Sequence, residues 1–264
     1  MVIISNKYKI IKNLGEGAFG KVFECEIIKK NVNAAIKIQA KDLPNVLKNE
    51  AKIYKFLQGI NGVPKLFNLG IFDGYNYLVI EKFKETIEKI ELSFEKQIFY
   101  FKQAIDILKN IHDKGLVHRD IKPENLMLDD NGNINFIDFG LSKLIISNNM
   151  HISFKEGKSL IGTAKYCSIN SHKGYELSRR DDIESLIYTF AFLKNKILPW
   201  DEISCSGEKL DVQEKILDIK DGNNLDFKWL ELNYLLLYLK TLDFTDEPNY
   251  KYIKCIIENS MILQ

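Results

Sequence analysis

Two carboxylates and one amide in the middle of the chain have a spacing that suits one kind of reaction. Residues 118–125 read His-Arg-Asp-Ile-Lys-Pro-Glu-Asn, and an Asp-Phe-Gly triplet begins at Asp138, eighteen residues after Asp120. The Asp120 carboxylate can accept the proton of an attacking hydroxyl, while Asn125 and Asp138 offer the hard oxygen ligands that Mg²⁺ prefers. The set favours phosphoryl transfer from a nucleotide, in which the protein mainly positions reactants and neutralises charge.

A glycine-rich stretch near the N-terminus could fold over the phosphates of that nucleotide. Residues 15–22 read Gly-Glu-Gly-Ala-Phe-Gly-Lys-Val and lie between two predicted strands. A dinucleotide-binding turn has to open a helix, so this context argues against one. Glycine lets the backbone approach a phosphate closely, but the pattern is short, and an ordinary glycine hairpin remains the alternative.

A lysine on a predicted strand could reach the same phosphates. Residues 34–37 read Ala-Ala-Ile-Lys, and the two-residue period of a strand places Ala35 and Lys37 on one face and Ile36 on the other. Glu50 follows thirteen residues after Lys37, on a predicted helix, and could pair with it. The alternative is a solvent-exposed strand lysine, since most lysines are exposed.

The elements that must position these groups change in character near Phe83. Before it, β-rich runs predict strands over residues 8–14, 22–28, 32–38, 65–71 and 75–81, with one helix over residues 45–57. We expect Val46, Ile53, Phe56 and Leu57 to lie near one face of that helix. A sheet-rich lobe followed by a helical lobe predicts a ligand-binding cleft between them.

The second half is predicted to be mainly helical. Ser93 can cap a helix whose apolar residues recur at spacings of three and four, namely Ile98, Phe101, Ile105, Leu108 and Ile111. Short apolar runs around Leu126 and over residues 134–137 then flank a turn at residues 130–132. From Asp182 onward the pattern is helical again.

Composition excludes several classes of protein. The 264 residues include 37 basic and 36 acidic side chains, and this balance argues against bulk binding to nucleic acid or to an anionic membrane. The four cysteines lie far apart, which disfavours a zinc site and favours free thiols in a reducing compartment. Neither a signal peptide nor an apolar run of ~20 residues is found, so we expect a soluble, intracellular protein.

Together these motifs resemble the signature set of the protein kinase superfamily, and the resemblance extends over residues 8–256. Two further segments narrow it. Residues 168–170 read Ser-Ile-Asn where most kinases carry Ala-Pro-Glu, and residues 178–182 read Ser-Arg-Arg-Asp-Asp. Both are similar to the casein kinase 1 family, with the vaccinia-related kinases as near neighbours. The resemblance implies a bilobal α+β fold with an N-lobe over residues 8–81, a hinge over 82–85 and a helical C-lobe over 86–256.

The resemblance also implies roles for individual residues. Lys37 would contact the α- and β-phosphates of ATP and pair with Glu50, and Asp120 would be the catalytic base. Lys122 would neutralise the γ-phosphate, and a lysine at this place marks serine/threonine rather than tyrosine kinases. Asn125 and Asp138 would hold Mg²⁺. Asp182 would cap its helix and brace the backbone around His118 and Arg119.

The nucleotide pocket implied by the resemblance spans the glycine-rich stretch, the strand lysine and the hinge. Ile80 would be the gatekeeper, Glu81 and Phe83 would bond the nucleotide through their backbone, and four apolar side chains would sandwich the adenine. The ATP-binding residues are then Leu14, Gly15, Glu16, Gly17, Ala18, Phe19, Gly20, Val22, Ala35, Lys37, Ile80, Glu81, Phe83 and Met127.

The family prefers acidic or already phosphorylated protein substrates, which a cationic site binds. Arg119, Lys165 and Lys220 are the candidates here, although a lysine in place of the family's usual arginine loses the planar fork that binds a phosphate through two nitrogens. We expect an enzyme that is active without phosphorylation of its activation loop, located in the cytoplasm, with the nucleus left open. The rivals are a pseudokinase that only binds partners and a small-molecule kinase of related fold.

Overall fold

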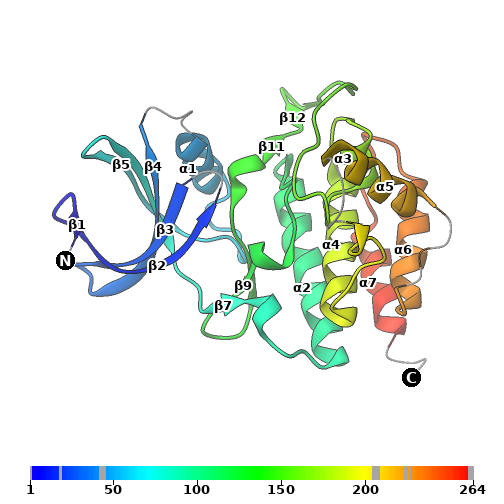
Figure 1. Ribbon diagram of the computed structural model, residues 1–264, viewed down its shortest axis with the longest axis horizontal. Helices are drawn as coiled ribbons and strands as arrows, with labels where there is room; N and C mark the ends of the chain where they lie inside the picture. Colours follow the sequence, from blue (N-terminus) through cyan, green and yellow to red (C-terminus); the bar gives the residue numbers. More distant parts are fainter. Residues whose placement is uncertain are drawn as a thin grey trace.

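Apolar runs separated by polar turns fold the first eighty residues into an antiparallel sheet. The computed structural model describes residues 2–17, 20–41, 46–203, 209–222, 225 and 227–260. Figure 1 shows the sheet and helix α1 (Val46–Phe56) at one end of the long axis and most of the helices at the other. The bilobal α+β architecture predicted above is therefore confirmed.

The strands of the N-terminal lobe form one sheet in the order β1-β2-β3-β4-β6-β5, and each neighbouring pair is antiparallel. The predicted strands agree with the observed ones to within a few residues. The strands are β1 (Ile3–Ile4), β2 (Tyr8–Gly17), β3 (Gly20–Ile27), β4 (Val32–Ala40), β5 (Leu66–Phe72) and β6 (Tyr75–Glu81).

Strand β4 separates two apolar cores. Ala34 and Ile36 pack with Cys25 and Val79 in a cluster on one face of the sheet. Ala35 faces the opposite way and packs against the main core, which runs from α1 into the C-terminal lobe. This two-residue alternation is the predicted one, and it points Lys37 toward the second lobe.

Helix α1 and the residue after it bury part of the predicted face. Leu57 is fully buried and Ile53 packs against the main core, as predicted, but Phe56 is 45% exposed. The prediction was wrong for Phe56 because it followed apolar side chains only, and the helix also buries Leu47, Glu50, Ala51 and Tyr54. The buried stripe includes a carboxylate, Glu50, which is held by an ion pair from β4 and so can lie on the inward face.

The C-terminal lobe is built around helix α2 (Phe94–Asp113), which Ser93 caps by accepting a hydrogen bond from the N–H of Lys96 at 3.4 Å. The five apolar residues predicted for its inner face are all at most 2% exposed. The other helices are α3 (Ile169–His172), α4 (Arg179–Asn195), α5 (Lys209–Asp221), α6 (Leu230–Lys240) and α7 (Tyr250–Asn259).

Short strands and turns at the join of the lobes carry the chemical motifs. The strands are β7 (Glu85–Thr86), β8 (Leu116–Val117), β9 (Leu126–Leu128), β10 (Ile134–Phe136), β11 (Lys143–Leu144), β12 (Ile146–Ser147) and β13 (Met150–His151). Strand β9 lies between β10 and β7, and the turn between β9 and β10 is the predicted one. Asn125 precedes β9 and Asp138 follows β10, so the antiparallel hairpin places both residues at the end opposite its turn.

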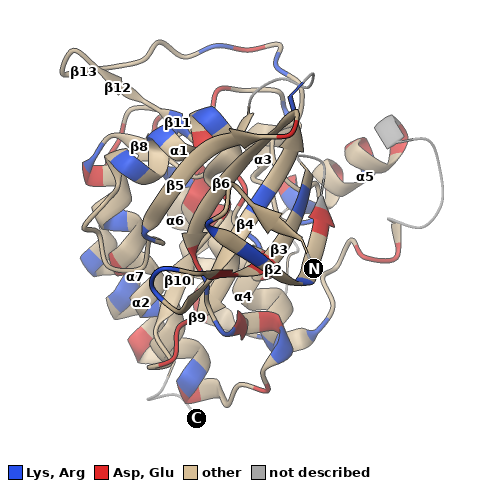
Figure 2. Cartoon of the chain, turned by 90° about the vertical axis from the view of Figure 1, so that its left-hand side faces the viewer, with Lys and Arg blue, Asp and Glu red and all other residues tan. Residues whose placement is uncertain are grey.

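Charge is mixed over the molecule. Figure 2 shows Lys and Arg interspersed with Asp and Glu along the helices and loops, in keeping with a net charge of +1. Among the described helices, none is both long enough and apolar enough to cross a membrane.

Candidate active site

A buried ion pair joins the two lobes. Lys37 Nζ on β4 lies 2.6 Å from Glu50 Oε1 on α1 and 3.1 Å from Asp138 Oδ1 in the C-terminal lobe. Burial favours the neutral amine, but the two carboxylates outweigh burial and raise the pKa of Lys37 above its ordinary value. Burial likewise opposes the charge of Asp138, yet Lys37 prevails and lowers the pKa of that carboxyl. The contact therefore favours the charged forms of Lys37 and Asp138, whereas burial raises the pKa of Glu50 although Lys37 opposes that shift.

The backbone at Asp138 is held in an unusual conformation. Asp138 has φ 63° and ψ 71°, the left-handed region, and its carboxylate accepts a hydrogen bond from Gly140 N–H at 3.4 Å. Its own N–H donates to the Tyr54 hydroxyl of α1 at 3.2 Å. The next residue, Phe139, is buried between the rings of Tyr54 and His118. These contacts fix the carboxylate where Lys37 reaches it.

Asp182 on α4 anchors the segment that carries Asp120. Its carboxylate accepts hydrogen bonds from the backbone N–H groups of His118 at 2.7 Å and Arg119 at 2.8 Å, as predicted from the resemblance. The expected helix cap was wrong, because Ser178 caps α4 together with Asp181. Arg119 has φ 69°, a strained value for a side chain of this size, so the segment needs such a restraint. Asp182 is in turn held by His112 Nε2 at 2.9 Å. Sequence reasoning gave His112 no such role.

Asp120 lies in a small network with three neighbours. Its carboxylate is 3.0 Å from Lys122 Nζ and accepts a hydrogen bond from the Thr163 hydroxyl at 2.9 Å. Lys122 also donates to Thr163 at 3.0 Å, and the Asn125 amide donates to the Asp120 carbonyl at 2.8 Å. The structure thus brings Asp120, Lys122 and Asn125 together, as expected. Thr163 was missed, because its only signal was a place just before the Ser-Ile-Asn stretch.

The donor set near Asp138 fits a hard divalent cation that is shared with phosphates. Asn125 uses its amide nitrogen on Asp120, so its amide oxygen is left for a ligand, and Asp138 adds a carboxylate that is 33% exposed. Among the described residues, no cluster of three or more His, Cys, Asp or Glu side chains could hold a metal. Mg²⁺ commonly takes one or two protein oxygens and completes its shell with water and phosphate, so the pair suffices.

The glycine-rich stretch forms the predicted hairpin, with Gly17 of β2 opposite Gly20 of β3. Gly20 has φ 124°, and a Cβ there would lie 2.2 Å from the carbonyl oxygen of Ile38, so only glycine fits. Glu16 at the hairpin pairs with Lys21 at 3.7 Å. Ala18 and Phe19, also assigned to the nucleotide pocket, lie outside the described residues.

The residues expected around the adenine come from both lobes. Leu14, Val22 and Ala35 belong to β2, β3 and β4, whereas Met127 belongs to β9. Ala35 pairs with Ile80, which is buried on β6, so the gatekeeper position adjoins the strand of Lys37. At the hinge, the N–H of Glu81 already donates to the Lys65 carbonyl at 2.9 Å. The described hydrogen bonds leave the backbone of Phe83 unpaired, so Phe83 can bond a nucleotide.

The three cations assigned to a substrate anion have separate partners. Arg119 Nε donates to the Leu141 carbonyl at 2.6 Å. Lys165 Nζ lies 2.7 Å from Asp201 Oδ2 and 4.0 Å from the centre of the Phe192 ring, and its side chain is 26% exposed. Among the described contacts, none joins any two of these cations.

Lys220 departs most clearly from its predicted place in a substrate-anion site. It is completely buried, and its Nζ donates to the carbonyls of Ala164 at 2.9 Å and Cys167 at 2.7 Å. Burial lowers its pKa to about 8. The resemblance made Lys220 a candidate cation for a substrate anion, but here it is an internal hydrogen-bond donor beneath the loop that carries Lys165.

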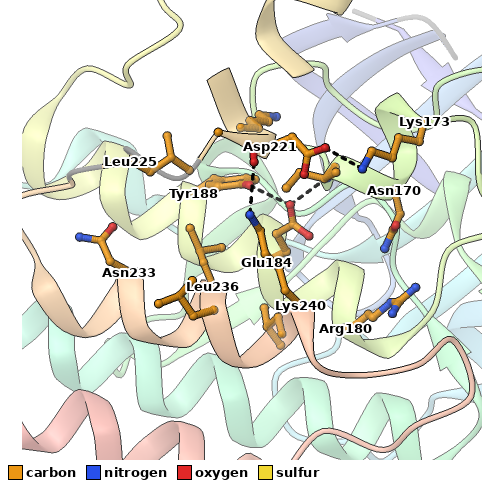
Figure 3. A pocket seen from close by; sticks show the side chains of 15 residues that line it. Asn170, Lys173, Arg180, Glu184, Tyr188, Asp221, Leu225, Asn233, Leu236 and Lys240 are labelled. Carbon is orange, nitrogen blue, oxygen red and sulfur yellow. Dashed lines mark hydrogen bonds and ion pairs between the residues drawn. The ribbon is translucent and has the colours of Figure 1, made fainter. Parts of the chain in front are cut away.

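A cavity of about 270 Å³ adjoins Lys220 in the helical lobe (Figure 3). It shares no lining residue with the Lys37–Asp120–Asp138 site. Within it, the Tyr188 hydroxyl donates to Glu184 at 2.7 Å, and Lys173 pairs with Asp221 at 2.7 Å. Burial raises the pKa of Glu184 to about 7.

Comparison with known proteins agrees with this geometry. The family model for the protein kinase domain matches residues 8–256. A probable casein kinase I homolog of Encephalitozoon cuniculi is 34% identical over 269 residues, which cover 95% of this chain and 84% of that protein. A casein kinase I homolog of Kluyveromyces lactis is 33% identical over 273 residues, covering 94% of this chain and 50% of that protein. The chain therefore belongs to the casein kinase 1 family of serine/threonine protein kinases.

Proposed function

We propose that this kinase transfers the γ-phosphate of Mg-ATP to serine and threonine hydroxyls of acidic or already phosphorylated proteins. The observation that carries the proposal is the contact of Lys37 with both Glu50 and Asp138. It holds a phosphate-binding cation and a metal-binding carboxylate in one place, between the sheet and the segment of Asp120. Kinase chemistry requires both groups to be in position together.

The nucleotide would lie between the glycine hairpin and β9, with its phosphates toward Lys37. Asn125 and Asp138 would hold Mg²⁺, which neutralises charge on the phosphates when bound. The substrate hydroxyl would then give its proton to Asp120, the only part of the transfer that needs a base. Lys122, 3.0 Å from Asp120, would balance the charge of the transferred phosphoryl group.

Ion pairs with Glu176 hold residues 143–158, which belong to the activation loop that the resemblance implies. The Glu176 carboxylate is 1% exposed and accepts hydrogen bonds from Lys143 at 2.8 Å and contacts Lys158 at 2.7 Å. The backbone adds bonds from Lys158 N–H to the Gly174 carbonyl and from Glu176 N–H to the Lys155 carbonyl. An internal carboxylate thus neutralises the cations that a loop phosphate would otherwise pair with, which supports activity without loop phosphorylation.

The preference for acidic or primed substrates rests on Lys165 in this proposal. Lys165 is partly exposed on the loop that follows Thr163, but Asp201 pairs with it. A substrate anion would therefore have to compete with Asp201 or share the ammonium with it. The contribution of such an exposed contact is modest and falls with added salt.

The presence of all four residues that phosphoryl transfer needs disfavours the rival function, a pseudokinase. Lys37, Asp120, Asn125 and Asp138 are all present and held by contacts that catalysis would use. A vaccinia-related type of activity would act on the same hydroxyls. We expect protein substrates in the cytoplasm, and neither nucleic acid nor a membrane as partner, because the charges are balanced.

Asp120→Asn should lower kcat toward casein by about 10²–10⁴-fold, because it removes the proposed base. ATP affinity should change little, since Asp120 is not among the residues assigned to the nucleotide. Asp130→Asn, the same change at an exposed turn, serves as the control. Turnover of Asp120→Asn within a few fold of wild type would contradict the role of Asp120.

Asp138→Ala should raise the Mg²⁺ concentration for half-maximal activity by at least about tenfold, because it removes a metal ligand. Lys37→Met should impair turnover without this shift, since it removes a phosphate contact and leaves Glu50 unpaired. Steady-state kinetics at varied Mg²⁺ separate the two. An unchanged magnesium dependence in Asp138→Ala would show that the metal assignment is wrong.

Lys165→Ala should raise the KM for a primed or acidic peptide by about 3–10-fold and leave a neutral peptide nearly unaffected. The matched control is Lys173→Ala, which removes a lysine from the nearby helix α3 end, where it pairs with Asp221. Phosphatase-treated enzyme is assayed with both peptides. Equal effects of Lys165→Ala on the two peptides would argue against anion recognition by Lys165.

A further inference from the structure

Lys220 of α5 lies beneath the loop that precedes α3. No part of its side chain reaches solvent, and its ammonium is held by the carbonyls of Ala164 and Cys167. A buried ammonium is costly unless it is hydrogen-bonded, so these two bonds are needed to keep Lys220 in place. The same two bonds fix the backbone of the loop at both of its ends.

Two other side chains contact the same loop from below. The indole N–H of Trp200 donates to the Lys165 carbonyl at 2.9 Å, and His172 Nε2 lies 3.1 Å from the Ala164 carbonyl. Lys220 is packed 4.7 Å from the Trp200 ring centre and 4.8 Å from that of Tyr188. His172 of α3, Trp200 after α4 and Lys220 of α5 therefore all contact the carbonyls of residues 164–167.

The loop begins with the residue that contacts Asp120. Thr163 donates its hydroxyl hydrogen to Asp120, and its carbonyl accepts hydrogen bonds from Tyr166 and Cys167 N–H, both at 2.8 Å. Residues 163–167 are thus one hydrogen-bonded turn. A shift of the carbonyls that Lys220 holds would move Thr163 and, with it, the surroundings of the Asp120 carboxylate.

Burial excludes a direct contact between Lys220 and a substrate. The ammonium is enclosed by the loop above it and by the buried Glu184 and Tyr188 beside the cavity of Figure 3. Lys220 also lines this cavity, yet it is fully buried and so offers no exposed face to a substrate anion. The effect of Lys220 on substrates must therefore pass through the backbone of residues 164–167.

We infer that Lys220 is a positioning residue, which sets the loop of residues 163–167 (the substrate loop) so that Thr163 and Asp120 meet the incoming hydroxyl. This inference rests on the proposed role of Asp120. It assigns the lysine to productive binding of every peptide, whatever its charge, and not to recognition of acidic or phosphorylated side chains.

The test is Lys220→Met, which keeps the length of the side chain and removes the ammonium. We expect kcat/KM to fall by about tenfold or more for an acidic and a neutral peptide alike. The KM for ATP should stay at the wild-type level, because Lys37 and Asp138 are untouched. Lys215→Met is the control, since Lys215 is exposed on the same helix and pairs with Asp211.

Several results would overturn the inference. One is a fall in kcat/KM confined to the acidic peptide, and another is wild-type kinetics with both peptides. The third is a rise in the KM for ATP as large as the fall in kcat/KM for the peptides. Lys220→Gln, which keeps a shorter uncharged donor, replaces the methionine variant if that one does not fold, and an intermediate loss is expected. Failure of both to fold would assign Lys220 to the fold as a whole. Inactivity of wild type and Lys215→Met would instead refute the proposed function itself.

Discussion

The ion pairs of Lys37 with Glu50 and Asp138 are the interaction on which the rest of the structure depends. Removing charged groups from water is unfavourable unless opposite charges meet at close range, and here Lys37 lies 2.6 Å from the buried Glu50 and 3.1 Å from the partly exposed Asp138. The strand period of β4 aims Lys37 at the second lobe, and α1 turns Glu50 inward. Tyr54, one turn further along α1, holds the backbone of Asp138. The sheet, helix α1 and the segment of Asp138 are thus fixed by one charged centre.

The helical lobe supplies the matching restraint on the other side. Asp182 holds the strained backbone at Arg119, and His112 holds Asp182, so the position of Asp120 is set from the interior of the lobe. The loop of residues 163–167 adds a further contact, because the Thr163 hydroxyl donates a hydrogen bond to Asp120. Each chemical group is therefore placed by a buried polar contact, whose removal would leave an unpaired charge or N–H group.

Local signals predicted a large part of this structure. Strand and helix ranges follow from apolar period and turn residues, the chemistry of the side chains groups Asp120, Asn125 and Asp138, and the resemblance adds Lys122. Errors arose where burial depends on distant partners. The inward face of α1 contains Glu50 only because Lys37 reaches it, and Lys220 is buried only because the carbonyls of residues 164 and 167 accept its hydrogens. Thr163 and Glu176 carry no local signal for their contacts.

The central claim is that this charged centre and a loop held by Glu176 make the chain ready to transfer phosphate without prior activation. The most direct measurement is the initial rate of casein phosphorylation by phosphatase-treated protein with Mg-ATP, followed by identification of the phosphorylated residues. The account predicts phosphoserine and phosphothreonine in casein with no lag. Binding of ATP without transfer, or a lag that ends only when the activation loop becomes phosphorylated, would contradict it.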